Sequence, residues 1–177
     1  ITNFFESSLK KADIVVTTGG VSVGDYDFVQ DVIKDKLKAE VLFHGVNIKP
    51  GMHILVALKD EKIIIALPGF AYSSTVCAIL YVLPLIYKFR NSNEKLPIVK
   101  AKINQDFFKP QGKTTFTACN VEYVNGEYQI NFDGKKSGSS AILTNMLESP
   151  ALLIQKENSQ DIKSGDLVDI LLLNNIK

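Results

Sequence analysis

The residues best suited to chemistry lie in one short segment, Thr17–Phe28, with the sequence TTGGVSVGDYDF. Its glycine pair, Gly19 and Gly20, follows an apolar run and would let the backbone turn sharply and approach a ligand closely. Free backbone N–H groups and a helix start can bind an anion such as phosphate. Asp25 and Asp27 offer hard oxygen ligands for a divalent cation; equally, either aspartate could simply be the N-cap of the helix. The segment matches neither the dinucleotide fingerprint nor the P-loop pattern.

Two further segments combine a Pro-Gly turn with polar residues. In NIKPGMHI, at 47–54, Lys49 stands beside the turn, where it could contact an oxyanion or be an ordinary solvated loop lysine. In LPGFAYSS, at 67–74, a helix begins after the turn, and its backbone donors could face an anion. Equally, they could be capped in the ordinary way by Ser73 or by contacts with water. Loops at the carboxyl ends of strands converge at one edge of an open α/β sheet, where such sheets bind ligands.

The elements that must position these loops follow from the apolar patterns. Strands are predicted at 12–18, 40–46, 54–58 and 62–67, the first as a buried parallel strand and the last two as a hairpin joined by Lys59-Asp60-Glu61. A helix is predicted at 26–38, with an apolar face formed by Phe28, Val29, Val32, Ile33 and Leu37. This order predicts a three-layer α/β sheet.

The stretch 70–87 carries no charge over 18 positions, which is near the lower bound for a membrane span. Three hydroxyl residues at its start, and Pro84 near its end, favour instead a buried helix of an α/β domain. We therefore expect no membrane association.

The composition changes at NSNEKLP, 91–97, which is polar and typical of a linker. Beyond it, strand-like runs of six to twelve residues replace helical periodicity. These runs are IVKAKINQ, KTTFTACNVEYV, EYQINF, ALLIQK and DLVDILLL. Asn125-Gly126 favours a tight type I′ hairpin, and 139–148 could be a short helix or a turn. The sequence thus predicts an α/β domain at 1–92 and a small all-β domain, a barrel, at 97–177.

Composition narrows the function classes. The 20 basic and 19 acidic residues give a net charge of +1, so no overall field attracts nucleic acid or an anionic membrane, and an anionic ligand needs a local site. Two cysteines make no disulfide framework, and two histidines cannot complete a zinc cluster with them. Cys77 and Cys119 are predicted to be buried, and a cytoplasmic location follows.

Taken together, the three loops and the following β unit resemble the molybdopterin molybdenumtransferase family, the family of bacterial MoeA and the E domain of gephyrin. The order and spacing of TTGGVSVGDYDF, N-I-K-P-G and L-P-G match over essentially all 177 residues. The first motif is quite specific, whereas the other two are weak alone. The resemblance implies a MogA/MoaB-like molybdopterin-binding fold, present in part, followed by the family's C-terminal β-barrel.

The resemblance also implies an activity. An enzyme of this family takes adenylylated molybdopterin and molybdate, cleaves the adenylyl link with release of AMP, and inserts molybdenum at the dithiolene with a divalent cation such as Mg²⁺. It implies a homodimer and a MogA-like adenylyltransferase as a possible partner. Two further domains and the first half of the α/β domain normally precede this stretch, so we expect the chain to be a fragment.

The family's functional residues carry over onto matching positions only. Asp27 closes the first motif and, with Lys49, is expected to be catalytic; Asp25 and Asp27 are the expected metal ligands. The expected cofactor-binding residues are Thr18, Gly19, Gly20, Ser22, Gly24, Pro68, Gly69 and Ser73.

Two positions depart from the family pattern. Met52 stands where the family has the second lysine of Lys-Pro-Gly-Lys, and Phe70-Ala71 replaces Asn-Pro after Leu-Pro-Gly. Losing a cation weakens the electrostatics of an oxyanion site. The alternative to a working enzyme is therefore a non-catalytic molybdopterin-binding or regulatory paralogue.

Overall fold

The chain divides into two compact units in this computed structural model, which describes residues 1–21, 28–108, 112–135, 143–146 and 150–173. The first unit is Ile1–Val46 with Gly51–Leu83, and the second is Asn47–Pro50 with Pro84–Lys177. Contacts rather than chain order define these units, so the domain boundaries at residues 92 and 97 stay a prediction.

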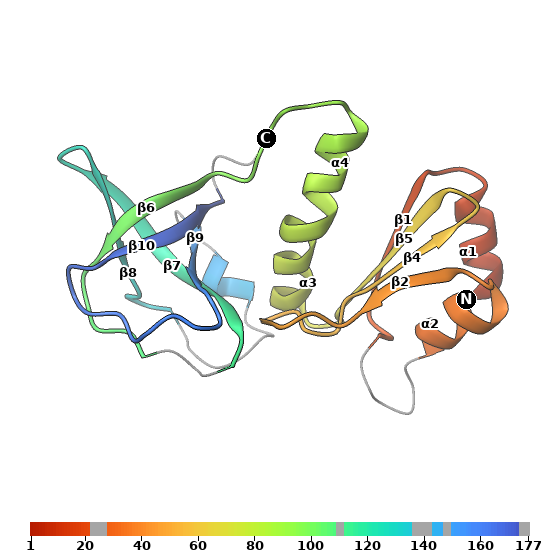
Figure 1. Ribbon diagram of the computed structural model, residues 1–177, viewed down its shortest axis with the longest axis horizontal. Coiled ribbons are helices and arrows are strands. Elements are labelled where there is room, and N and C mark those ends of the chain that lie inside the picture. The colour runs from red at the N-terminus through yellow and green to blue at the C-terminus, as the bar shows by residue number, and fades with distance from the viewer. Residues whose placement is uncertain (22–27, 109–111, 136–142, 147–149, 174–177) are drawn as a thin grey trace. The chain divides into compact units, whose positions relative to one another are not determined.

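The first unit contains a four-stranded sheet (Figure 1). Its strands are β1 (Ile14–Thr18), β2 (Glu40–His44), β4 (Leu55–Lys59) and β5 (Lys62–Leu67), in the order β1-β5-β4-β2. β1 runs parallel to β5, whereas β4 is antiparallel to both of its neighbours. Because β5 and β2 are both antiparallel to β4, they run in the same direction as each other and as β1. The strands β1, β5 and β2 therefore all end at the same edge of the sheet.

The predicted hairpin is confirmed and turns tightly. The register pairs Lys59 with Lys62, so Asp60 and Glu61 form a two-residue turn. Their φ angles are 49° and 63°, as the two central positions of a type I′ turn require.

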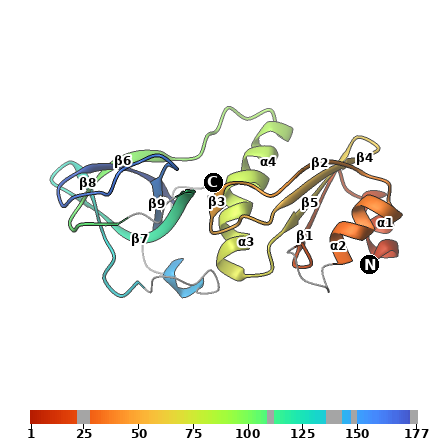
Figure 2. The same cartoon turned by 60° about the horizontal axis from the view of Figure 1, so that its bottom comes forward.

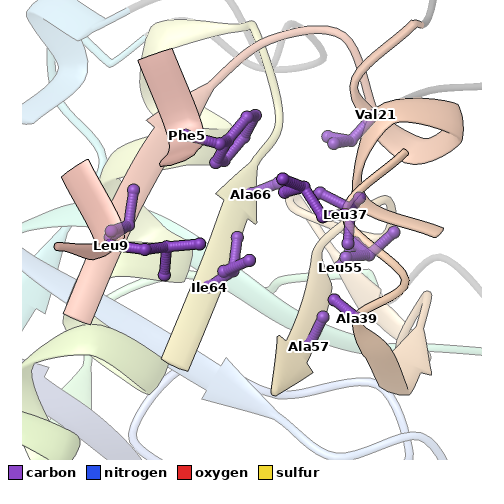
Figure 3. Close-up of a cluster of buried hydrophobic side chains, with 11 residues drawn as sticks. Phe5, Leu9, Val21, Leu37, Ala39, Leu55, Ala57, Ile64 and Ala66 are labelled. Atoms are coloured by element: carbon purple, nitrogen blue, oxygen red, sulfur yellow. The ribbon is translucent and has the colours of Figure 1, made fainter. Parts of the chain in front are cut away.

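Helices cover both faces of this sheet, which confirms the three-layer architecture. The helix α1 (Thr2–Leu9) and the helical segment α2 (Phe28–Asp31) with the π-helical η1 (Val32–Lys36) lie on one face, and α3 (Ala71–Cys77) lies on the other (Figures 1 and 2). The core on the first face is built from Phe5, Leu9, Val15, Val21, Ile33, Leu37, Ala39, Leu55, Ala57, Ile64 and Ala66 (Figure 3).

Two expectations about burial are wrong. In β1 only Val15 is buried, and Val16 is 41% exposed, because among the described residues β1 pairs with β5 alone and forms an edge of the sheet. Phe28 is 53% exposed and lies off the apolar face predicted for its helix, whose buried residues are Ile33 and Leu37.

The apolar stretch forms one helix, Ala71–Phe89, in which α3 continues into the π-helical η2 (Ala78–Val82) and α4 (Leu83–Phe89). Its buried residues in α3 are Tyr72, Ser73, Val76 and Cys77, whereas η2 has none. By length and composition it is the one helix among the described residues that could cross a membrane, and 28% of its most apolar window is buried. The prediction of a helix is confirmed, but the expected burial is reached only in part.

The second unit is a closed five-stranded barrel (Figures 1 and 2). Its strands are β6 (Ile98–Ile103), β7 (Thr114–Val124), β8 (Glu127–Asn131), β9 (Pro150–Gln155) and β10 (Leu167–Leu172). They pair in the order β7-β8-β6-β10-β9, and β9 pairs again with β7, which closes the barrel. Asn125 and Gly126 have φ of 51° and 86° and form the predicted type I′ turn.

Two short elements complete the second unit. The two-residue strand β3 (Ile48–Lys49) pairs in parallel with the start of β7, and a 3₁₀ helix, η3 (Leu143–Met146), lies within the stretch predicted as a short helix or turn.

Candidate functional site

The loops after β1 and β5 meet backbone to backbone. The amide N of Gly19 donates to the carbonyl O of Leu67 at 2.9 Å. A Cβ added to Gly69 would lie 3.4 Å from the Cα of Gly19. This approach brings the glycine pair and the Pro-Gly turn together at the carboxyl edge of the sheet, as the sequence predicts.

Gly20 directs the chain from this edge into α2. Its φ is 72°, a conformation that favours glycine, and its carbonyl accepts a hydrogen bond from the Val29 amide at 3.2 Å. A Cβ at position 20 would lie 2.6 Å from Cγ2 of Val29, closer than real contacts allow. The next residue, Val21, is 1% exposed and anchors the loop in the core.

The start of α3 has no side-chain cap. Phe70 occupies the N-cap position with extended backbone, and no side chain bonds the first amides there. The hydroxyls of Ser74 and Thr75 donate to the carbonyl of Ala71 at 3.0 and 2.9 Å, so they point back into the helix. Ser73 is buried at 4% exposure and does not cap the helix, which rules out the ordinary cap considered from the sequence.

A residue that the sequence analysis passed over also reaches this edge. His44 ends β2, and its Nε2 lies 3.2 Å from the carbonyl O of Val21. A carbonyl only accepts, so Nε2 carries the proton in this contact. The sequence did hold one indication of this role: His44 is the last residue of β2, which ends at the same edge of the sheet as β1 and β5.

The structure brings several of the predicted site residues together within the first unit. Thr18, Gly19, Gly20, Pro68 and Gly69 lie at the joined ends of β1 and β5, and Ser73 lies in the first turn of α3. Lys49 belongs to the second unit, where it pairs with Thr115 of β7. Ser22, Gly24, Asp25 and Asp27 lie outside the described residues.

The positions that depart from the family pattern are accessible. Phe70 is 61% exposed, and Met52, in the connection between β2 and β4, is 36% exposed. The carbonyl of Met52 accepts from the amide of Val46 at 2.9 Å. A larger or charged side chain at position 52 would therefore enter solvent rather than the core.

No group of three metal-ligating side chains occurs in the part of the chain that the structure describes. The loop residues present at the edge, Thr18, Gly19, Gly20 and Gly69, supply no carboxylate.

The thiol in α3 is not a nucleophile. Cys77 lies in α3, fully buried, and its Sγ donates to the carbonyl of Gly51 at 3.3 Å. Burial raises the pKa of Cys77 to about 12, so the reactive thiolate is absent at neutral pH.

Family models match both units. Residues 1–88 match a probable molybdopterin binding domain, and residues 100–173 match the MoeA C-terminal region, domain IV. The molybdopterin molybdenumtransferase of Bacillus subtilis is 32% identical over 169 residues, which is 95% of this chain and 39% of the relative. The chain belongs to the MoeA family. It spans about two fifths of the length of the curated relatives it matches.

Other relatives agree with this MoeA assignment. The molybdopterin molybdenumtransferase of Staphylococcus epidermidis is 29% identical over 94% of this chain and 39% of its own. The crystal structure of the moeA protein from Pyrococcus horikoshii OT3 has a TM-score of 0.69 and 26% identity, covering 97% of this chain and 38% of its own. The fold class expected from the sequence, a MogA/MoaB-like α/β domain in part and then a MoeA barrel, is thus confirmed.

Proposed function

We propose that the whole protein is a molybdopterin molybdenumtransferase that inserts molybdate into adenylylated molybdopterin and releases AMP. The observation that carries the proposal is the approach of Gly19 and Gly69 beside the uncapped start of α3. Two glycine-containing loops and a helix start bring backbone amides to one edge of the sheet, and such an arrangement suits a phosphate. The names of the relatives support molybdopterin as the molecule that carries this phosphate.

In this proposal the joined loops bind and orient the substrate, and charged residues act on it. The binding residues would be Thr18, Gly19, Gly20, Ser22, Gly24, Pro68, Gly69 and Ser73. Lys49 would stabilise negative charge that develops on the phosphoanhydride. Asp27 would orient the attacking water, and Asp25 and Asp27 would hold Mg²⁺, which supplies charge neutralisation when bound.

We further propose that the protein is a cytoplasmic homodimer that receives its substrate from a MogA-like adenylyltransferase. The net charge near zero supports a small-molecule substrate rather than nucleic acid. Sedimentation of the whole protein tests the dimer. Recovery in the soluble fraction without detergent tests the location, and recovery in membranes would contradict it.

The decisive experiment is molybdate insertion by the whole protein and by Asp27→Asn. We expect Asp27→Asn to fold normally and to lose at least about tenfold in rate, the scale for one catalytic electrostatic group. Asp31→Asn is the matched control, because Asp31 is an exposed carboxylate in α2 outside the binding residues. Unchanged turnover in Asp27→Asn would remove Asp27 from the mechanism. Molybdopterin binding without turnover in the unaltered protein would favour the non-catalytic paralogue.

A further inference from the structure

The contact between His44 and Val21 joins two strands that are not neighbours. β5 and β4 lie between β1 and β2 in the sheet. Neighbouring strands are spaced about 4.8 Å apart, so β1 and β2 lie about 14 Å from each other. Yet His44 Nε2 is 3.2 Å from the carbonyl O that follows the glycine pair. The segment Gly19–Val21, the anchored loop, and the His44 side chain must therefore together span the ends of β5 and β4.

Three hydrogen bonds hold the anchored loop, each from a different element. The Gly19 amide donates to β5, the Gly20 carbonyl accepts from α2, and the Val21 carbonyl accepts from His44 of β2. The first two are backbone bonds, which any sequence could make. The third depends on a side chain.

We infer that His44 is a positioning residue, whose Nε2–H fixes the anchored loop so that its backbone donors face the phosphate of the pterin ligand. The inference rests on the proposed function for the identity of that ligand. The anchoring itself needs no ligand. His44 acts through the loop and is not placed on the reacting atoms.

The geometry distinguishes the possible replacements. Glutamine carries an amide nitrogen at nearly the distance of Nε2 from the backbone, so His44→Gln can restore the donor. Asparagine is shorter and leucine has no donor, so His44→Asn and His44→Leu lose the bond. His53→Leu is the matched control, because His53 is a half-buried histidine of the same unit in the connection between β2 and β4.

Two measurements on the whole protein test the inference. Amide hydrogen exchange of Gly19–Val21 without ligand should become about 2- to 10-fold faster in His44→Leu and His44→Asn, and the Kd for molybdopterin should rise by the same factor with kcat unchanged. His44→Gln and His53→Leu should match the unaltered protein in both.

Exchange that stays unchanged in His44→Leu would overturn the anchoring, and faster exchange with unchanged affinity would overturn the positioning role. Lack of molybdopterin binding by the unaltered protein would instead refute the proposed function. The exchange rates would still decide whether His44 anchors the loop.

Discussion

Gly69 packs against Gly19 so closely that a Cβ at position 69 would stand 3.4 Å from the Cα of Gly19. One glycine follows β5 and the other follows β1, and these parallel strands end together. Because neither residue has a side chain, the two loops present bare backbone over the space they share. That contact helps to shape the proposed phosphate surface, and the neighbouring Gly20 is packed more tightly still, against Val29.

Gly20→Ala should destabilise the first unit strongly. The new Cβ would lie 2.6 Å from Val29 Cγ2, and alanine is strained at φ 72°. Strain of about 1–2 kcal/mol and overpacking of about 1–3 kcal/mol predict a loss of about 2–5 kcal/mol in the free energy of unfolding. Gly134→Ala is a matched control, since Gly134 has φ 71° and nothing within 4 Å. If urea unfolding shows the same loss in free energy of unfolding for Gly20→Ala and Gly134→Ala, Val29 moves aside at no energetic cost.

Met52→Lys should strengthen anion binding without loss of stability. Met52 is 36% exposed, so lysine would not be buried, and we expect unfolding to change by less than about 0.5 kcal/mol. A charge-assisted hydrogen bond would tighten binding of molybdate or the pterin phosphate by about 10- to 150-fold. Added salt should reduce the gain. Titration calorimetry with Met52→Gln as a neutral control checks this, and unchanged affinity in Met52→Lys would show that position 52 does not face the anion.

Asp106→Asn should lower barrel stability at neutral pH. The carboxylate of Asp106 accepts from Lys163 Nζ and from the Ser164 amide, both at 2.9 Å. These bonds lower the pKa of Asp106, so their contribution is present above the usual aspartate pKa and is lost as pH falls through the lowered value. The difference between the unaltered protein and Asp106→Asn should therefore shrink in urea titrations from pH 7 towards pH 2.

A control for the bonds of Asp106 with Lys163 and Ser164 lies elsewhere in the barrel. Asp169 pairs with Lys100 on the neighbouring strand at 2.8 Å. We expect Asp169→Asn to have a smaller effect, because a single surface ion pair contributes little, whereas Asp106 also accepts from the Ser164 amide. A pH-independent loss in Asp106→Asn would point to packing rather than to charge.

Both cysteines should resist thiol reagents until the protein unfolds. Cys77 and Cys119 are buried and free, and burial raises the pKa of each to about 12. The thiolate, which is the reactive form, is therefore scarce at pH 8. A disulfide reagent such as DTNB should label neither cysteine in the folded protein and both in urea. Fast labelling without denaturant would contradict the burial of the labelled thiol.

The sequence predicts those features of the fold that are determined by residues close together in the chain, and it fails for features that depend on residues far apart. All five barrel strands lie within the predicted runs to within one or two residues, because alternation and turn residues act over a few positions. The exposure of Val16 depends on how many strands pair with β1, and the residues around Val16 in the sequence do not indicate that number. The contact of His44 with Val21 joins elements that are distant in the sheet order, and the burial of Ser73, which does not cap α3, depends on packing between elements. The carboxylates of Asp25 and Asp27 remain predictions.

The pairing of β3 with β7 makes the folding of the two units interdependent. Asn47 Nδ2 donates to the carbonyl of Gly112, 65 positions along the chain, and Ile48 pairs with Thr114. During synthesis, residues 47–50 leave the ribosome long before β7 does. The strand β3 therefore cannot pair with β7 until β4, β5, α3 and β7 itself have been made. Such non-local pairing is slow to form. The second unit therefore includes a segment synthesised before the first strand of its barrel, and a barrel expressed alone from residue 97 would lack β3.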